Sequence, residues 1–585
     1  MTTSHDLRLH LELVRLTRGI GGLRLAIADG VERLEVLGGV QKLGFPGVDA
    51  YARERLGRSG RWVGDARTLA RRLAVLPLLL EAYLSGRLST SKVELLARHL
   101  VRGEDEAEAI ALAASLTVRE LRRRLGGHEG DVLDDERRRF VQLTRHVDRL
   151  DAVAFEGVIR LMEALGETTR SAAIEGLLAE GLTTLLNRVE LAPDLVSRIA
   201  GWALGTVGAP RDTAPDVATA EPDTDVGPAV HNDLALEPEL RTPTIDPAIV
   251  DVGLLDLELR ALSAELMRRD LRLGELALEV ERGGVAFTHG HRTIDDYYRE
   301  ALGIAPSSMA ARVALARRVC RLPRLKLAIE GGAVGFETAT LLARVATPST
   351  EDAWLTLADI STTKIFREHV DAAELHARAN GLPLDGLRPP TEAQLDEAGE
   401  LERKVLAMVL ANTNDSDETR SSDTGPDTGP DTGPDPEPGP MSVSGSSNDE
   451  TLGIVPLRLT LPDDLPAFWC DLEFLHADAG FPAGTFIGFL VASTLDTWRG
   501  MTKLPAYGDI YLRDRFRCQN PVCTSRNCTP HHIVFRSRGG GDEPSNLVSL
   551  CDRCHISLVH GGHLTVTGVA PDALDWMARA YRIAA

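Results

Sequence analysis

Apolar residues recur at the spacing of an amphipathic helix in two distant parts of the chain. Each stripe has intervals of four, three and four residues, and the members are Leu9, Leu13, Leu16 and Ile20, then Leu255, Leu259, Leu262 and Leu266. Such spacing places the side chains on one face of an α-helix, which then packs on another apolar surface. Pro77 and Pro323 mark further helix starts, and Gly86 and Gly332 mark helix ends. Both regions are therefore predicted to be helical.

The two stripes belong to a longer internal repeat. Residues 48–98, aligned without gaps to residues 294–344, are identical at about nineteen of 51 positions. An offset of 246 residues is too long for a solenoid repeat and indicates two copies of one domain. Residues 140–185 and 455–498 add a weaker correspondence, because each predicts a short strand followed by two helices.

The Leu-rich stripes suggest how the copies are arranged. They could join the copies as an internal pseudo-dimer, or join two chains as a homodimer, and ordinary core packing within each copy is the other interpretation. Two Pro-, Asp-, Thr- and Gly-rich segments, 207–248 and 412–450, interrupt the helical pattern. Such segments cannot bury much apolar surface, so we expect extended linkers, the second of them a disordered acidic tract with an Asp-Thr-Gly-Pro repeat.

The predicted fold class is mainly α. We expect two duplicated helical domains, a small C-terminal domain that contains cysteines, and connecting segments. The boundaries are 1–206 for the first copy, 249–411 for the second, 451–509 for a segment of strand and helices, 510–570 for the small domain and 571–585 for a C-terminal helix.

Charge and hydropathy narrow the range of partners. The formal net charge of −21 disfavours nucleic acid as a partner of the whole chain. Around the small domain, however, the sequence contains seven arginines and only four acidic residues. The arginines are Arg513, Arg515, Arg517, Arg526, Arg536, Arg538 and Arg553. No apolar run approaches twenty residues and no signal-peptide pattern is present, so we expect a cytoplasmic protein without a membrane partner.

Five of the seven cysteines fall between Cys518 and Cys554. Two pairs, Cys518 with Cys523 and Cys551 with Cys554, have a spacing that can close one tetrahedral structural zinc site. So short a region needs a structural metal to offset its chain entropy. Cys528 either replaces Cys523 as a ligand or packs as a small apolar residue.

Four thiolates fill a structural zinc site, so the nearby histidines need another explanation. They are His531, His532, His555 and His560. Imidazole binds divalent metals and accepts a proton near neutral pH, so a second, open metal site is indicated beside a general base. A zinc module that merely folds is the alternative.

At these residues the chain resembles the HNH endonucleases. The resemblance runs over the His531-His532 pair, the triple glycine from Gly539 and the stretch from Asn546 to Cys551. It implies a ββα-metal fold in which His532 activates water and Asn546 braces the loop.

The resemblance also implies the catalytic metal ligands and the substrate contacts. His531 and His555, with His560 as a further candidate, would hold a catalytic divalent ion, and Arg536 and Arg538 would contact phosphate. Many members carry Asp at the position of His531, which leaves the choice among Mg²⁺, Mn²⁺ and another transition metal open. The run from residue 44 to residue 89 also resembles the helical part that precedes the nuclease in many bacterial HNH proteins.

The residues and the resemblance together predict a metal-dependent endonuclease that acts on DNA, with His532, Asn546 and His555 in its catalytic centre. Two alternatives stay open. One is a zinc-stabilised nucleic-acid-binding protein without cleavage activity, and the other is an endonuclease that acts on RNA.

Overall fold

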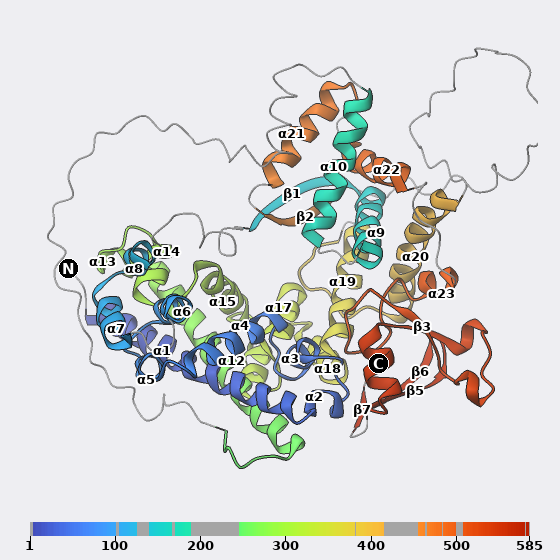
Figure 1. The fold of residues 1–585 in the computed structure, drawn as a ribbon. Coiled ribbons are helices and arrows are strands. Elements are labelled where there is room, and N and C mark those ends of the chain that lie inside the picture. Colours follow the sequence, from blue (N-terminus) through green and yellow to red (C-terminus); the bar gives the residue numbers. More distant parts are fainter. Residues whose placement is uncertain are drawn as a thin grey trace, which may run out of the picture.

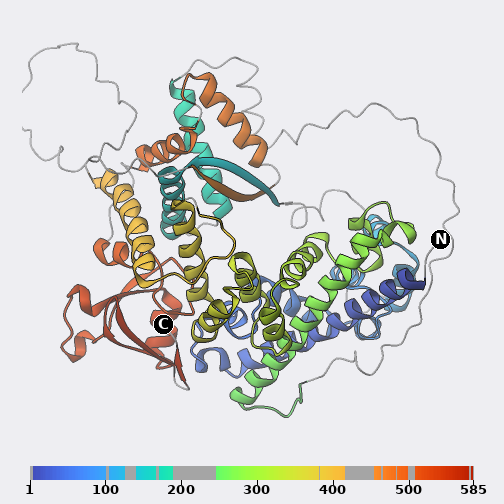
Figure 2. The ribbon, with the colours of Figure 1, turned by 180° about the vertical axis from the view of Figure 1, so that it is seen from behind.

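The computed structural model is mainly helical, with small antiparallel sheets (Figure 1; Figure 2). The residues that it describes are 4–100, 105–125, 140–166, 170–188, 245–380, 382–414, 454–462, 465–482, 484–498, 507–578 and 581–583. Most of the predicted linkers 207–248 and 412–450 therefore lies outside the described residues. None of the described helices is long and apolar enough to cross a membrane.

Two long helices form the axis of the helical body. They are α1 (Ser4–Val36) and α12 (Val252–Gly283), and they pack side by side in opposite directions (Figure 1; Figure 2). Their predicted stripes are buried except for Ile20, which is partly buried: Leu13, Leu255, Leu259 and Leu266 are each 0% exposed. The apolar periodicity thus correctly indicated both helices and their buried faces.

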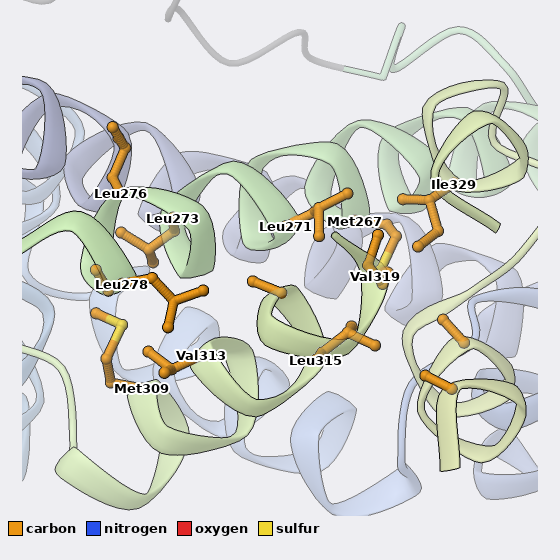
Figure 3. Packing of buried hydrophobic residues seen from close by; sticks show 14 of the residues in the cluster. Met267, Leu271, Leu273, Leu276, Leu278, Met309, Val313, Leu315, Val319 and Ile329 are labelled. Carbon is orange, nitrogen blue, oxygen red and sulfur yellow. The ribbon is translucent and has the colours of Figure 1, made fainter. Parts of the chain in front are cut away.

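Shorter helices surround this pair in two series. The first series is α3 (Val48–Arg55), α4 (Gly60–Leu73), α5 (Pro77–Leu84), α6 (Thr90–His99), α7 (Glu106–Ser115) and α8 (Val118–Leu125), after a short α2 (Gly39–Lys42). The second is α14 (Ile294–Asp296), η2 (Tyr297–Ala301), α15 (Pro306–Val319), α16 (Pro323–Glu330), α17 (Phe336–Val345), α18 (Glu351–Ile360) and α19 (Thr363–Ala379), after a short α13 (Val285–Thr288). Figure 3 shows α12 burying Leu271 and Leu273 against Val313 and Leu315 of α15. The duplication itself stays a prediction.

A second body joins segments that are three hundred residues apart. It contains β1 (Phe140–Asp148), α9 (Arg149–Gly166) and α10 (Arg170–Arg188), then β2 (Ile454–Pro462), α21 (Leu465–Asp478) and α22 (Phe486–Trp498). The two predictions of a strand followed by two helices are thus confirmed. The strands pair antiparallel, with Phe140 opposite Pro462, so β2, α21 and α22 share one hydrophobic core with β1, α9 and α10. Pairing of β1 with β2 satisfies the backbone hydrogen bonds that two isolated strands would leave unmade.

The C-terminal domain contains short elements around two strands. These are α23 (Gly508–Arg513), β3 (Thr529–His532), η3 (Arg536–Arg538), η4 (Pro544–Asn546), β4 (Leu547–Leu550) and η5 (Arg553–His560), followed by β5 (Leu564–Val569), β6 (Ala573–Ala578) and β7 (Tyr581–Ile583). β3 pairs antiparallel with β4. The domain packs on the helical body through α3, α19 and α20 (Glu392–Asn414).

The predicted helix at residues 571–585 is wrong, because β6 and β7 occupy this stretch. Burial alternates along β6: Trp576 and Ala578 are buried, whereas Met577 between them is 45% exposed. A period of two belongs to a strand, and pairing with β5 covers an otherwise open sheet edge.

Candidate metal centres

Four cysteines converge as the spacing predicted. Their Sγ atoms lie within 4.8 Å of one another, and all four side chains, Cys518, Cys523, Cys551 and Cys554, are buried. Burial raises the pKa of the Cys518 thiol, so thiolates at this position need a compensating cation. Asn520 Nδ2 donates to Cys554 Sγ over 3.2 Å, as an outer partner of a metal-bound thiolate does. This donor set suits a structural zinc ion.

Cys528 lies outside this cluster. It is partly exposed, and its Sγ lies 3.9 Å from the Ser525 carbonyl oxygen. Of the two sequence interpretations, the structure therefore favours packing over ligation, since Cys523 belongs to the four-thiol group.

The loop between Cys518 and Cys523 is held by the helical body. Lys364 Nζ on α19 donates to the carbonyl oxygens of Cys518 and Asn520, over 2.9 and 3.2 Å. Thr362 Oγ1 donates to the Pro521 oxygen over 2.8 Å, and Arg53 on α3 donates to the Val522 oxygen over 2.7 Å. The first and the second helical series thus both contact this loop.

Three histidines form a second group. His531 lies on β3, whereas His555 and His560 lie on η5, and the ligand nitrogens of the three rings are within 4.8 Å of one another. η5 is a π-helix, in which residues five apart are neighbours, so the five-residue spacing that left His560 uncertain brings it beside His555.

The state of these imidazoles suits metal ligation. Burial, followed by the nearby His555 and His560 rings, lowers the pKa of His531 to about 3, so the ring is neutral at pH 7. His531 is 1% exposed, and among the described residues its buried Nε2 has no hydrogen-bond partner. Thr529 Oγ1 lies 2.9 Å from His555 Nδ1, which leaves the other ring nitrogen for a ligand. A divalent cation would satisfy the orphaned His531 nitrogen.

His532 follows on the same strand, where successive side chains point to opposite faces. Its Nε2 lies 2.7 Å from Asp542 Oδ1, and Arg536 donates to both oxygens of that carboxylate over 2.6 and 2.8 Å. The hydrogen bond from His532, and then that from Arg536, lowers the pKa of Asp542. From the sequence, Asp542 was only one of the four acidic residues near the small domain; its place directly after the triple glycine was the signal that could have singled it out.

Asn546 ties the ends of the intervening loop together. Its Oδ1 accepts from Val534 N over 2.7 Å, and its Nδ2 donates to the oxygens of Val534 and Gly541 over 3.1 and 2.8 Å. Gly540 is needed at this turn, because a Cβ atom there would lie 1.8 Å from the Val534 oxygen. Asn546 thus fixes the segment that directly follows His532.

The predicted cationic surface is smaller than the seven arginines suggested. Arg513 donates to the carbonyl oxygens of Pro544 and Leu547, and Arg515 and Arg517 pair with Glu402. These three side chains hold the domain together and to the helical body. Of the two arginines predicted to contact phosphate, Arg536 pairs with Asp542, and Arg538 lies over the Phe535 ring at 5.4 Å.

Residues 516–559 match the family model of the HNH endonucleases. This part of the chain is therefore an HNH domain, near the C-terminus and preceded by a long helical region. The family generally carries endonuclease activity. No curated protein and no solved structure matches the chain.

Proposed function

We propose that the HNH domain hydrolyses phosphodiester bonds of DNA with a divalent metal ion and with His532 as the general base. The observation that supports this most is the juxtaposition on β3. His531 is the buried member of a three-histidine group whose other members, His555 and His560, are partly buried and exposed, and the adjacent His532 contacts an acid–arginine pair. Metal ligation and proton transfer are thus separated onto the two faces of one strand.

His531, His555 and His560 would hold the catalytic ion. Among Mg²⁺, Mn²⁺ and the other transition metals, three imidazoles favour a transition metal. When bound, the ion supplies Lewis-acid stabilisation of charge that develops on the phosphate oxygens. Cys518, Cys523, Cys551 and Cys554 would hold a separate structural zinc. A cytoplasmic location stays a prediction from the sequence.

The chain's own residues divide the remaining work. His532 Nε2 lies 2.7 Å from Asp542 Oδ1 and 3.1 Å from Arg536 Nε. In the tautomer that donates from Nε2 to Asp542, Nδ1 is free of a proton and takes the proton of the attacking water. Arg536 and Arg538 contact the phosphate, and such contacts position the nucleic acid without reading its base sequence. Asn546 holds the chain after His532 in place. Because these groups address the phosphodiester, RNA is the second candidate substrate.

Nicking of supercoiled plasmid with Mg²⁺, Mn²⁺ or Ni²⁺ tests the proposal. Replacing His532 with Ala should lower the rate by about 10²- to 10⁴-fold while metal binding is retained, because His532 belongs to neither metal group. Equal rates for both proteins would refute the assigned base. Absence of cleavage with every metal, together with retained DNA binding, would favour a zinc-stabilised binding protein. Selective cleavage of RNA would identify the alternative substrate.

A further inference from the structure

Residues about 246 positions apart make equivalent contacts across the two helical series. Glu54 of the first series accepts a hydrogen bond from Thr363 N, in the first turn of α19, over 2.6 Å. Glu300 of the second series accepts one from Val118 N, in the first turn of α8, over 2.5 Å. Each glutamate therefore caps a helix of the opposite series.

A second pair of contacts repeats this relation. Gly57 O accepts from Glu337 N over 3.2 Å, and Gly303 O accepts from Ser91 Oγ over 2.8 Å. The two series also approach closely at both places, because a Cβ atom on Gly57 would lie 2.5 Å from Gly335 Cα and one on Gly303 would lie 2.3 Å from Ser89 Cβ. The start of α8 thus occupies the place in one half that the start of α19 occupies in the other.

The α19 side of this arrangement is covered by the HNH domain. Lys364 is 8% exposed and the Arg53 side chain 14% exposed, since both donate to the loop between Cys518 and Cys523. Glu368, one turn further along α19, pairs with Arg517 over 3.2 Å. Cations and an acid of the helical body together bind the domain here.

The equivalent surface on α8 keeps the cations but has an arginine in the place of Glu368. Asp296 pairs with Arg299 at its border, over 3.3 Å. The helix starts fix the register: Val118 N and Arg119 N donate to Glu300 as Thr363 N and Lys364 N donate to Glu54, an offset of 245 residues. Arg119 therefore corresponds to Lys364 and Arg123 to Glu368, and Arg299 corresponds to Arg53 at an offset of 246. Arg119, Arg123 and Arg124 are exposed, and the Arg299 side chain is 37% exposed. We call these four arginines the α8 face. The acid of α8, Glu120, bonds back to the Thr117 amide and hydroxyl, over 2.9 Å each, and caps its own helix.

We propose that the α8 face binds the phosphate backbone of nucleic acid, at a place remote from the HNH site. Figures 1 and 2 place α8 at the end of the helical body opposite the HNH domain. A second HNH domain fits this face poorly, because Arg123 would stand against the arginine that Glu368 binds. Exposed guanidinium groups suit phosphate oxygens. The choice of nucleic acid as partner rests on the proposed function.

The test measures, by fluorescence anisotropy across a salt series, how a DNA duplex of about 40 base pairs binds to the full chain in the absence of divalent metal. The triple variant R119Q/R123Q/R124Q should bind roughly tenfold or more weakly, and the slope of log K against log salt should be shallower by about two to three. The matched control R282Q/R318Q/R321Q removes the same charge from exposed positions elsewhere and should bind like the wild type. The lysine triple R119K/R123K/R124K should also retain binding.

Three results would overturn the inference: an unchanged salt slope in the glutamine triple, an equal loss in the control, or a loss in a folded lysine triple. A dimer in sedimentation velocity that R119Q/R123Q/R124Q dissociates would also overturn it, in favour of a second copy as the occupant. The cleavage assay keeps this question separate from the proposed function. If the glutamine triple lowers DNA binding but the wild type cuts no DNA, the nuclease proposal alone is refuted. If the wild type cuts DNA but the glutamine triple leaves the salt slope of binding unchanged, the α8 face alone is refuted.

Discussion

Replacing Asn546 with Ala should slow cleavage without disturbing either metal group. The substitution removes three hydrogen bonds, to Val534 N, Val534 O and Gly541 O, and leaves the cysteine and histidine ligands untouched. A neutral hydrogen bond contributes about 1 kcal/mol net, so the loop would lose up to about 3 kcal/mol of its preference for the observed conformation.

That free energy sets the size of the effect. About 1.4 kcal/mol corresponds to a factor of ten in rate, so the full loss would lower kcat by roughly a hundredfold. Val534 is 49% exposed, and water can replace part of the lost bonding at its amide and carbonyl. We therefore expect a decrease in kcat of about ten- to a hundredfold with little change in KM. N546D should lose at least as much, because its carboxylate keeps the acceptor but faces two carbonyl oxygens.

The assay is single-turnover nicking of supercoiled plasmid, with metal content measured on the same samples. Ser545→Ala is the matched control, since the exposed Ser545 side chain precedes Asn546 in η4 and its main chain is unchanged by the substitution. A rate for N546A within twofold of the wild type would refute the bracing role. Loss of bound metal in N546A would refute the separation between loop and ligands.

Three further outcomes are expected. Asp270 is 0% exposed between Arg58 and Arg312, at 2.5 and 2.6 Å, so D270N should lower the free energy of unfolding in urea by about 3–5 kcal/mol. Burial alone would raise the pKa of Asp270, but the two guanidinium groups lower it. The stability that ionised Asp270 contributes is therefore fully present above the unfolded-state pKa of ~3.9 and is lost as the pH falls through the folded-state pKa. D270N should lack this loss of stability in acid. H560A should weaken metal binding about ten- to a hundredfold in a titration, whereas H563A, outside the histidine group, should not. K364M leaves the Cys518 and Asn520 oxygens without their donor and should cost about 1–3 kcal/mol, read as a lower thermal midpoint while zinc content stays at the wild-type value.

Much of the candidate site could be predicted from the spacing of residues that are close in the sequence. The four cysteines could be grouped from sequence because each pair is close in the chain and thiolates suit one tetrahedral ion. The stripes of α1 and α12 were readable because a buried helix face has a fixed period. His560 could be given only as a further candidate ligand, since an α-helix brings residues three or four apart together, and the π-helical turn at η5 could not be predicted from the local sequence.

Contacts between distant segments were beyond such reasoning. The two strand–helix–helix units were predicted, but nothing in either strand specifies that β1 pairs with β2 across some three hundred residues. Arg515 and Arg517 were counted as positive charge available near the small domain because their partners, Glu368 and Glu402, lie more than a hundred residues away in the sequence. The strands at residues 573–583 were missed because a short apolar stretch fits a helix or a strand until a sheet edge is available for pairing.

The position of the HNH domain depends on both helical series. Arg53 of the first series and Thr362 and Lys364 of the second bind main-chain oxygens of one loop, which also carries two of the four thiols. If either series moved relative to the other, at least one of these donors would leave its acceptor, and buried donors without acceptors are costly. Docking of the domain and packing of α1 on α12 therefore stabilise each other. The α8 face is held by the same helical packing, so the distance from that face to the HNH site is fixed by the body and not by a linker.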